Sequence, residues 1–204
     1  MAETLIRSRA TTQDRLVQAA REVLVRDGFQ AFGVNAVARE AGCDKQLIYR
    51  YFGGLEGLVT ALCVKESDTL AAALEAQVPP HPASDYAGLI EHLVLAYLDA
   101  LTANPAAQTL VLWELSEPAP ALAGFARSRA RALAGWIARY QGRLTPPEGI
   151  DALAVNALLI ATVHQIMLAR RASRAGRPDS PEQDAAWARA RAALSHIVRQ
   201  ALSA

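Results

Sequence analysis

The chain has 204 residues, of which 52% are hydrophobic and 20% charged, so general disorder and more than about two domains are excluded. Its 21 Lys and Arg residues nearly balance its 20 Asp and Glu residues, and the net charge of +1 offers no global attraction to a polyanion or an anionic membrane. With two cysteines and four histidines that lack metal-ligand spacing, we expect no disulfide framework, no metal site and no cofactor.

Apolar residues recur at helical spacing along almost the whole chain. This pattern predicts an all-α protein of about nine helices. The first helix should begin at Thr11 or Thr12, where Thr11 and Asp14 resemble a capping box, and end at Gly28.

Two short helices should follow, one over residues 34–41 and one from Asp44 to about Phe52. Gly42 permits a sharp turn between them. Three helices with a glycine in the turn before the third describe a helix-turn-helix, whose third helix lies in the major groove of DNA.

The outward face of this third helix carries hydrogen-bond donors. Lys45 and Arg50 can donate to guanine edges or phosphates, Gln46 can pair with adenine, and Tyr49 can donate to a phosphate oxygen. The alternative is an ordinary solvated helix face. The predicted DNA-binding residues are Lys45, Gln46, Leu47, Tyr49, Arg50 and Tyr51.

From residue 55 onward the pattern changes to longer amphipathic helices separated by proline-rich and glycine-rich breaks. We expect a DNA-binding domain over residues 1–54 and a helical regulatory domain over residues 55–204. The later helices are predicted from 55 to the prolines at 79–82, over 84–103, up to about 115, and over 122–140, 150–172 and 181–202. Ser180 and Gln183 predict a capping box at the last of these.

The regulatory helices carry aromatic and polar residues that can equally fill a packed core or line a ligand pocket. A pocket of this kind would suit a small apolar ligand. The candidate ligand-binding residues are His92, Tyr97, Trp113, Glu114, Trp136, Tyr140, His164 and Met167.

The last two helices carry small and aliphatic residues that can form either core or a four-helix interface between two subunits. The candidate dimer residues are Ala157, Ala161, His164, Ala190, Leu194, Ile197 and Val198.

Other function classes find little support in the sequence. The longest apolar stretch, residues 152–163, is interrupted by Asn156 and is too short for a membrane span, so we expect no membrane partner and a cytoplasmic location. Nucleotide-binding and hydrolase motifs are missing, which predicts that the protein is not an enzyme. Cys43 and Cys63 are more typical of small buried hydrophobes than of redox switches.

The stretch VNAVAREAGCDKQLIYRYFGGLEGL, residues 34–58, is similar to the DNA-binding domain of the tetracycline-repressor (TetR) family. The shared features are Ala41-Gly42 at the turn, the Leu47-Ile48-Tyr49 and Tyr51-Phe52 cluster, and Glu56 with Leu58. This resemblance implies a homodimer on a near-palindromic operator in double-stranded DNA. It also implies a phosphate contact from Tyr49 and base or backbone contacts from Lys45, Gln46 and Arg50.

Several positions depart from the family pattern. Gly33 stands where a threonine usually caps the second helix and touches phosphate, and Leu55 replaces a lysine that meets phosphate. We expect Lys45, Arg50 and an N-terminal arm with Arg7 and Arg9 to compensate. The other departures are Cys43, Asp44, Gln46 and Leu47.

The leading hypothesis is a repressor that responds to a small-molecule effector of unknown identity. One alternative is an activator or a constitutive regulator without a ligand. The other is an all-α ligand-binding or enzymatic domain with a vestigial helix-turn-helix.

Overall fold

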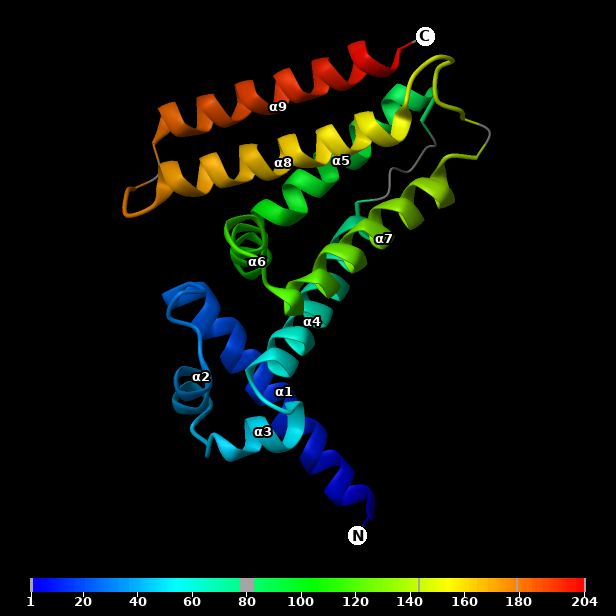
Figure 1. The fold of residues 1–204 in the computed structure, drawn as a ribbon. Coiled ribbons are helices and arrows are strands. Elements are labelled where there is room, and N and C mark those ends of the chain that lie inside the picture. The colour runs from blue at the N-terminus through cyan, green and yellow to red at the C-terminus, as the bar shows by residue number, and fades with distance from the viewer. Residues whose placement is uncertain (1, 78–82, 143, 179, 204) are drawn as a thin grey trace. The chain divides into compact units, whose positions relative to one another are not determined.

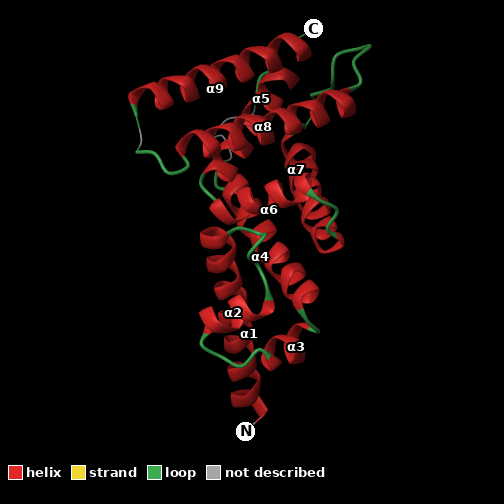
Figure 2. Ribbon diagram, turned by 60° about the vertical axis from the view of Figure 1, so that its left-hand side comes forward, coloured by secondary structure: helices red, strands yellow, loops and turns green. Residues whose placement is uncertain are grey.

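The computed structural model describes residues 2–77, 83–142, 144–178 and 180–203, with side chains from residue 11 onward. Within these ranges every regular element is helical, with nine α-helices, one short 3-10 helix and no strand (Figure 2). The all-α prediction is therefore confirmed. The side chains of Arg7 and Arg9, the expected N-terminal arm, lie outside the described side chains.

Figure 1 shows the order of the helices along the chain. Each predicted helix after the first has a counterpart that begins and ends within a few residues of its expected position. The elements are α1 (Ala2–Asp27), α2 (Val34–Ala41), α3 (Gln46–Phe52), α4 (Leu55–Glu75), α5 (Tyr86–Thr102), α6 (Pro105–Ser116), η1 (Pro120–Leu122), α7 (Ala123–Tyr140), α8 (Ala152–Arg174) and α9 (Pro181–Leu202).

The first helix begins earlier than predicted. Thr11 and Thr12 lie inside α1, which starts at Ala2, so Thr11 and Asp14 do not cap a helix start. The physical reason is that residues 2–12 contain neither glycine nor proline, and nothing in them stops a helix.

The predicted cap of α9 is present. The Ser180 hydroxyl accepts a hydrogen bond of 3.3 Å from the backbone N–H of Gln183, and the Gln183 side-chain oxygen accepts one of 3.2 Å from the backbone N–H of Ser180. Both groups would otherwise lack intrahelical partners. The capping box therefore fixes the start of this helix.

The chain forms two compact units. Unit 1 comprises residues 1–69 and 105–129, and unit 2 comprises residues 70–104 and 130–204. The chain crosses between the units three times, within α4, between α5 and α6, and within α7. The boundary predicted after residue 54 separates two functions and does not coincide with the limits of these compact units. It stays a prediction.

Unit 1 is built around α1, which packs against α2 and α6. The buried side chains of α1 recur every three or four residues, as expected for a helix with one apolar face. Those that are fully buried are Leu16, Ala20, Val23 and Leu24.

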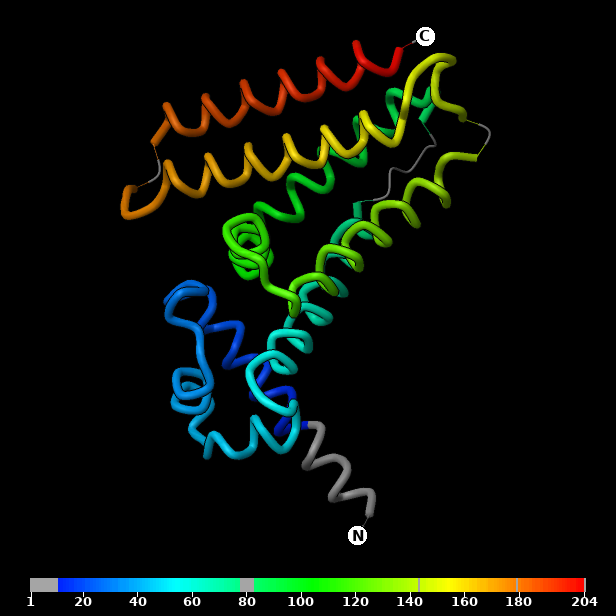
Figure 3. Tube along the Cα trace, viewed as in Figure 1, coloured from blue at the N-terminus to red at the C-terminus, as the bar shows by residue number. Residues whose placement is uncertain are grey.

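Unit 2 is built around α5, which is in contact with both α8 and α9. The latter two helices run antiparallel beside each other (Figures 1 and 3). Most residues of α5 are buried, which is the pattern of a helix covered on several sides.

In the part of the chain that the structure describes, α8 is the single helix that is long and apolar enough to cross a membrane by length and composition. A second candidate arises only if the bent pair α3 and α4 counts as one span. The apolar segment of α8 is longer than the sequence pattern suggested, because residues 152–169 contain no Asp, Glu, Lys or Arg. Core helices of soluble proteins can have the same length and composition. Of the apolar window, 22% is buried inside the protein.

Candidate functional site

The predicted recognition helix α3 exposes the expected face. Ile48 is fully buried, whereas Tyr49 is 56% exposed. Lys45, Gln46 and Arg50 are also exposed. Of the other predicted DNA-binding residues, Leu47 and Tyr51 are half-buried. The helix therefore presents three nitrogen donors and a phenol to solvent while its aliphatic side anchors it.

The turn before α3 is fixed by backbone geometry. Gly42 adopts the left-handed conformation (φ 61°, ψ 39°), which ends α2 at little steric cost. The backbone N–H of Cys43 donates to the Ala38 carbonyl at 3.1 Å. The Asp44 carboxylate then accepts a 2.8 Å hydrogen bond from the backbone N–H of Gln46. These bonds set the direction in which α3 leaves the turn.

The end of α3 is held close to the start of α4. Gly53 adopts φ 75°, and its N–H donates to the Tyr49 carbonyl at 3.0 Å. A Cβ atom on Gly57 would lie 1.8 Å from the Phe52 carbonyl oxygen. Position 57 therefore accepts only glycine without a shift of the backbone.

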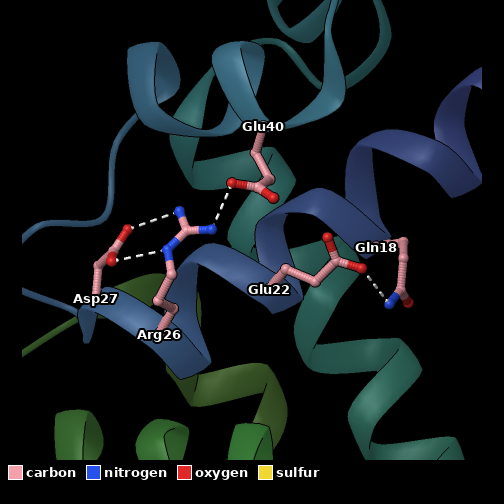
Figure 4. Close-up of polar contacts among 5 residues, drawn as sticks. All are labelled: Gln18, Glu22, Arg26, Asp27 and Glu40. Carbon is pink, nitrogen blue, oxygen red and sulfur yellow. Dashed lines mark hydrogen bonds and ion pairs between the residues drawn. The ribbon is translucent and has the colours of Figure 1, made fainter.

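Polar contacts join α1 to α2 (Figure 4). Arg26 donates to both carboxylate oxygens of Asp27, at 3.0 and 2.9 Å, and to Glu40 in α2 at 2.6 Å. The hydrogen bonds from Arg26 lower the pKa of Asp27. Arg15 adds a 3.1 Å bond to the Ala41 carbonyl at the end of α2. The scaffold behind α3 is thus tied together at its surface as well as in its core.

Gly33 begins α2 without a side-chain cap. Its backbone is extended (φ −169°), which any residue can adopt, and an added Cβ would meet no atom within 4 Å. A side chain such as the threonine of the family pattern would therefore fit at position 33, and the space available does not require glycine there.

Two candidate ligand residues, Trp113 and Glu114, lie in unit 1 with partners of their own. Trp113 stacks on Phe29 with 5.6 Å between ring centroids and donates to Glu117 at 2.8 Å. Glu114 accepts two hydrogen bonds, of 3.0 and 3.1 Å, from the buried Arg129. The Glu114 carboxylate thus ties α6 to α7, whereas the Trp113 N–H bonds locally at the end of α6.

Unit 1 also buries charge between α1 and α4. The carboxylate of Glu66, 2% exposed, pairs with Arg21 at 3.0 Å. One helical turn earlier, Cys63 is buried. Burial raises the pKa of the Cys63 thiol to about 12, with Glu114 and Glu66 adding to the effect. Cys43, by contrast, is only half-buried.

The remaining candidate ligand residues lie in unit 2, in two groups. The Tyr97 hydroxyl and His164 Nε2 lie 2.7 Å apart, and both side chains are buried, as is Met167. His92 stacks on Trp136 with 5.6 Å between centroids, and Trp136 contacts Tyr140 at 4.8 Å. These side chains pack against one another.

A small cavity lies between α5, α7 and α8, with a volume of about 30 Å³. Tyr97 is the one candidate ligand residue among its described lining. The other lining residues were not predicted as ligand contacts, although the Asn156 amide within the apolar run of α8 is a signal for such a site. The lining residues are Ile90, Leu93, Val94, Tyr97, Leu133, Ile137, Asn156, Ile160 and Val163.

The candidate dimer residues divide into two classes. Leu194, Val198 and His164 are buried within unit 2, so they support the helices from inside. Ala157, Ala161 and Ile197 are exposed, and Ala190 is half-buried. Leu153 and Leu158, which were not among the predicted dimer residues, are 84% and 69% exposed on α8. An apolar face therefore remains uncovered there.

No group of three or more His, Cys, Asp or Glu side chains in the described ranges could hold a metal ion. The chemistry available at α3 is hydrogen bonding and charge, and at the cavity it is apolar contact with one amide and one phenol.

The chain resembles known regulators in sequence. The family model described as bacterial regulatory proteins of the tetR family matches residues 16–62. The uncharacterized HTH-type transcriptional regulator Rv1255c of Mycobacterium tuberculosis is 26% identical over 138 residues, which are 66% of this chain and 64% of that protein. The HTH-type transcriptional repressor SCO4008 of Streptomyces coelicolor is 33% identical over 103 residues, 50% of this chain and 49% of that protein. The chain thus spans less than two thirds of the length of these relatives.

The fold is shared with solved structures. A transcriptional regulator from Rhodococcus sp. Rha1 superposes with a TM-score of 0.70 at 20% identity, over 94% of this chain and 98% of that chain. The matched segment, residues 16–62, contains α2, α3 and the turn whose geometry is given above. Residues 16–62 thus carry a helix-turn-helix segment that matches the TetR family of bacterial regulatory proteins, and the chain as a whole is similar in sequence to helix-turn-helix transcriptional regulators and in fold to a solved transcriptional regulator.

Proposed function

We propose that this protein is a repressor that binds a near-palindromic DNA operator as a homodimer and is released by a small apolar ligand. The observation that carries the proposal is the opposite exposure of the two sides of α3, with Ile48 buried and Tyr49 exposed. The Streptomyces relative is named a transcriptional repressor, which supports repression over activation.

Each exposed group of α3 has a role in this proposal. Arg50 and Lys45 donate to guanine edges or phosphates, and Gln46 pairs with adenine. Tyr49 donates its hydroxyl to a phosphate oxygen and positions the helix without selecting sequence. Residues 1–52 hold eight Lys or Arg against six Asp or Glu, a net charge of 8 − 6 = +2. Binding should therefore weaken with salt, but only moderately.

The second subunit would cover the apolar face of α8. Leu153, Leu158 and Ile197 are large exposed aliphatic side chains, and contiguous exposed apolar surface is typical of an interface. Between them lie small residues, Ala157 and Ala161, which let helices approach closely. A twofold axis through this face makes the same surface meet itself.

The effector would act through unit 2. A ligand changes the operator affinity only if it binds the DNA-bound and the free conformation with different affinities. The cavity beside Tyr97 and Asn156 supplies a place for such a ligand. Because operator DNA lies in the cytoplasm, the proposal places the protein there.

Fluorescence anisotropy with DNA flanking the protein's own gene tests this proposal. The expected result is tighter binding than to random DNA of the same length, and loss of that preference when an effector is added. Binding that persists at every effector concentration would support a constitutive regulator. Equal affinity for all DNA would support the vestigial helix-turn-helix and contradict the proposal.

A further inference from the structure

The described lining of the cavity between α5, α7 and α8 contains one polar group whose hydrogen-bonding capacity is unused. Asn156 lines the cavity from α8, and its Oδ1 is buried with no hydrogen-bond partner among the described residues. We propose that the effector is a neutral, mainly apolar molecule that carries one hydrogen-bond donor, a hydroxyl or N–H, and that Asn156 Oδ1 accepts this hydrogen bond. This inference rests on the proposed function, in which the cavity is the effector site.

The walls of the cavity select an uncharged molecule. Apart from Asn156 and Tyr97, the described lining is aliphatic, with residues such as Leu93, Ile137 and Ile160, and no charged side chain takes part. An ion that entered would lose its hydration without gaining a counter-charge, which is far more costly than the transfer of a neutral polar group. The site therefore discriminates against carboxylates and amines.

The second polar group of the lining is already engaged. The Tyr97 hydroxyl lies 2.7 Å from His164 Nε2, so its contact with a ligand would compete with this bond. A buried acceptor without a partner carries a desolvation penalty that a ligand donor removes. Asn156 is therefore the lining residue with the most to gain from a polar ligand, and it sets the position of the donor.

Because the cavity is small, a ligand would bind two conformations of unit 2 with different affinities, as a switch requires. A volume of about 30 Å³ is well below the roughly 150 Å³ of an apolar protein cavity that binds benzene. A ring-sized effector therefore binds only when the helices around the cavity, α5, α7 and α8, separate or their side chains repack. Such a ligand favours the expanded conformation of unit 2 over the compact one.

Titration calorimetry on the full chain with three probes of similar shape tests the ligand class. Phenol carries a donor, toluene replaces the hydroxyl by a methyl group, and benzoate carries a charge. Phenol should bind roughly two- to tenfold more tightly than toluene, the gain expected for one net hydrogen bond, and benzoate should show no binding.

The variant Asn156→Leu removes the acceptor and keeps a side chain of similar size. It should bind toluene at least as well as the wild type does and lose the preference for phenol, so that the ratio of the two dissociation constants falls to about one. Gln165→Leu is the matched control, because Gln165 is an exposed amide on the same helix. Its ratio should stay at the wild-type value. Asn156→Ala provides a second variant without the amide should the leucine not be accommodated.

Three results would overturn the inference: equal affinity of the wild type for phenol and toluene, an unchanged ratio in Asn156→Leu and Asn156→Ala, or no binding of any probe. The proposed function fails in a different way. If phenol binds with the expected preference but the affinity for operator DNA does not change, the ligand class stands and the regulatory role of the cavity is wrong.

Discussion

Ile48 and Tyr49 are consecutive residues of α3, yet Ile48 is fully buried and Tyr49 is 56% exposed. Successive helical residues point about 100° apart, so one buried residue fixes where its neighbours point. With Ile48 in the core of unit 1, Tyr49 and Arg50 are held on the solvent side. The proposed DNA-reading face is thus a consequence of packing behind it.

Substitution at Tyr49 and Arg50 separates positioning from sequence recognition. Tyr49→Phe removes one phosphate hydrogen bond and should weaken binding to all DNA sites alike, by about 1 kcal/mol. Arg50→Ala should cost about 1–3 kcal/mol at particular base pairs and relax the preference there. Anisotropy titrations against a set of single-base operator variants measure both effects.

An unchanged sequence preference in Arg50→Ala would make Arg50 a phosphate contact. Both side chains are exposed, so the variants should unfold at the wild-type temperature, which calorimetry can verify.

The joint between α3 and α4 predicts a strong effect of a single methyl group. In Gly57→Ala the new Cβ would lie 1.8 Å from the Phe52 carbonyl oxygen, and because that atom belongs to the backbone, α3 must move relative to α4. We expect a lower unfolding temperature together with loss of operator binding. Gly33→Ala is the control, since its Cβ meets no atom within 4 Å. Wild-type stability and DNA binding in Gly57→Ala would contradict the observed close approach.

The apolar face of α8 predicts a dimer that one charge can split. Leu158→Glu should give a folded monomer, because Leu158 is 69% exposed in the protomer and an unpaired carboxylate in an interface is costly. Sedimentation velocity at micromolar concentration measures the mass.

The matched control for the dimer is Leu115→Glu, on α6, where the leucine is 59% exposed and lies outside the proposed interface. It should sediment like the wild type. A wild-type protein that sediments as a monomer would rule out the homodimer, as would a Leu158→Glu variant that stays dimeric.

The two thiols should differ in reactivity. With its pKa raised to about 12 by burial, Cys63 has almost no thiolate at pH 8, and the thiolate is the reactive form. A disulfide-exchange reagent should therefore titrate one thiol per native chain, that of the half-buried Cys43, and two in denaturant. Raising the pH toward 12 should increase the Cys63 rate while the fold persists. Two fast thiols in the native protein at pH 8 would contradict the burial of Cys63.

Much of the fold could be predicted from the sequence because its determinants are local. Helix periods, the capping box at Ser180 and the glycine turn at Gly42 are set by neighbouring residues, and each occurs where the pattern predicts it. The predicted start of α1 was wrong because residues 2–12 contain no glycine or proline, and nothing else there stops the helix. The exposed face of α3 followed from the helical repeat alone.

The contacts of the regulatory helices were harder to predict, because an apolar pattern identifies a buried face without identifying the element that covers it. Leu194 and Val198 have the spacing of an interface but are buried within unit 2. Trp113 and Glu114 lie in unit 1 with partners of their own. The cavity depends on contacts between α5, α7 and α8, which are distant in sequence.

Footprinting on the DNA beside the protein's own gene tests the central claim most directly. We expect protection of a near-palindromic sequence whose half-sites are about one helical turn of DNA apart, or a multiple of it, and loss of that protection in Arg50→Ala. If no sequence is protected before the protein concentration is high enough for non-specific binding to all DNA, the central claim is contradicted.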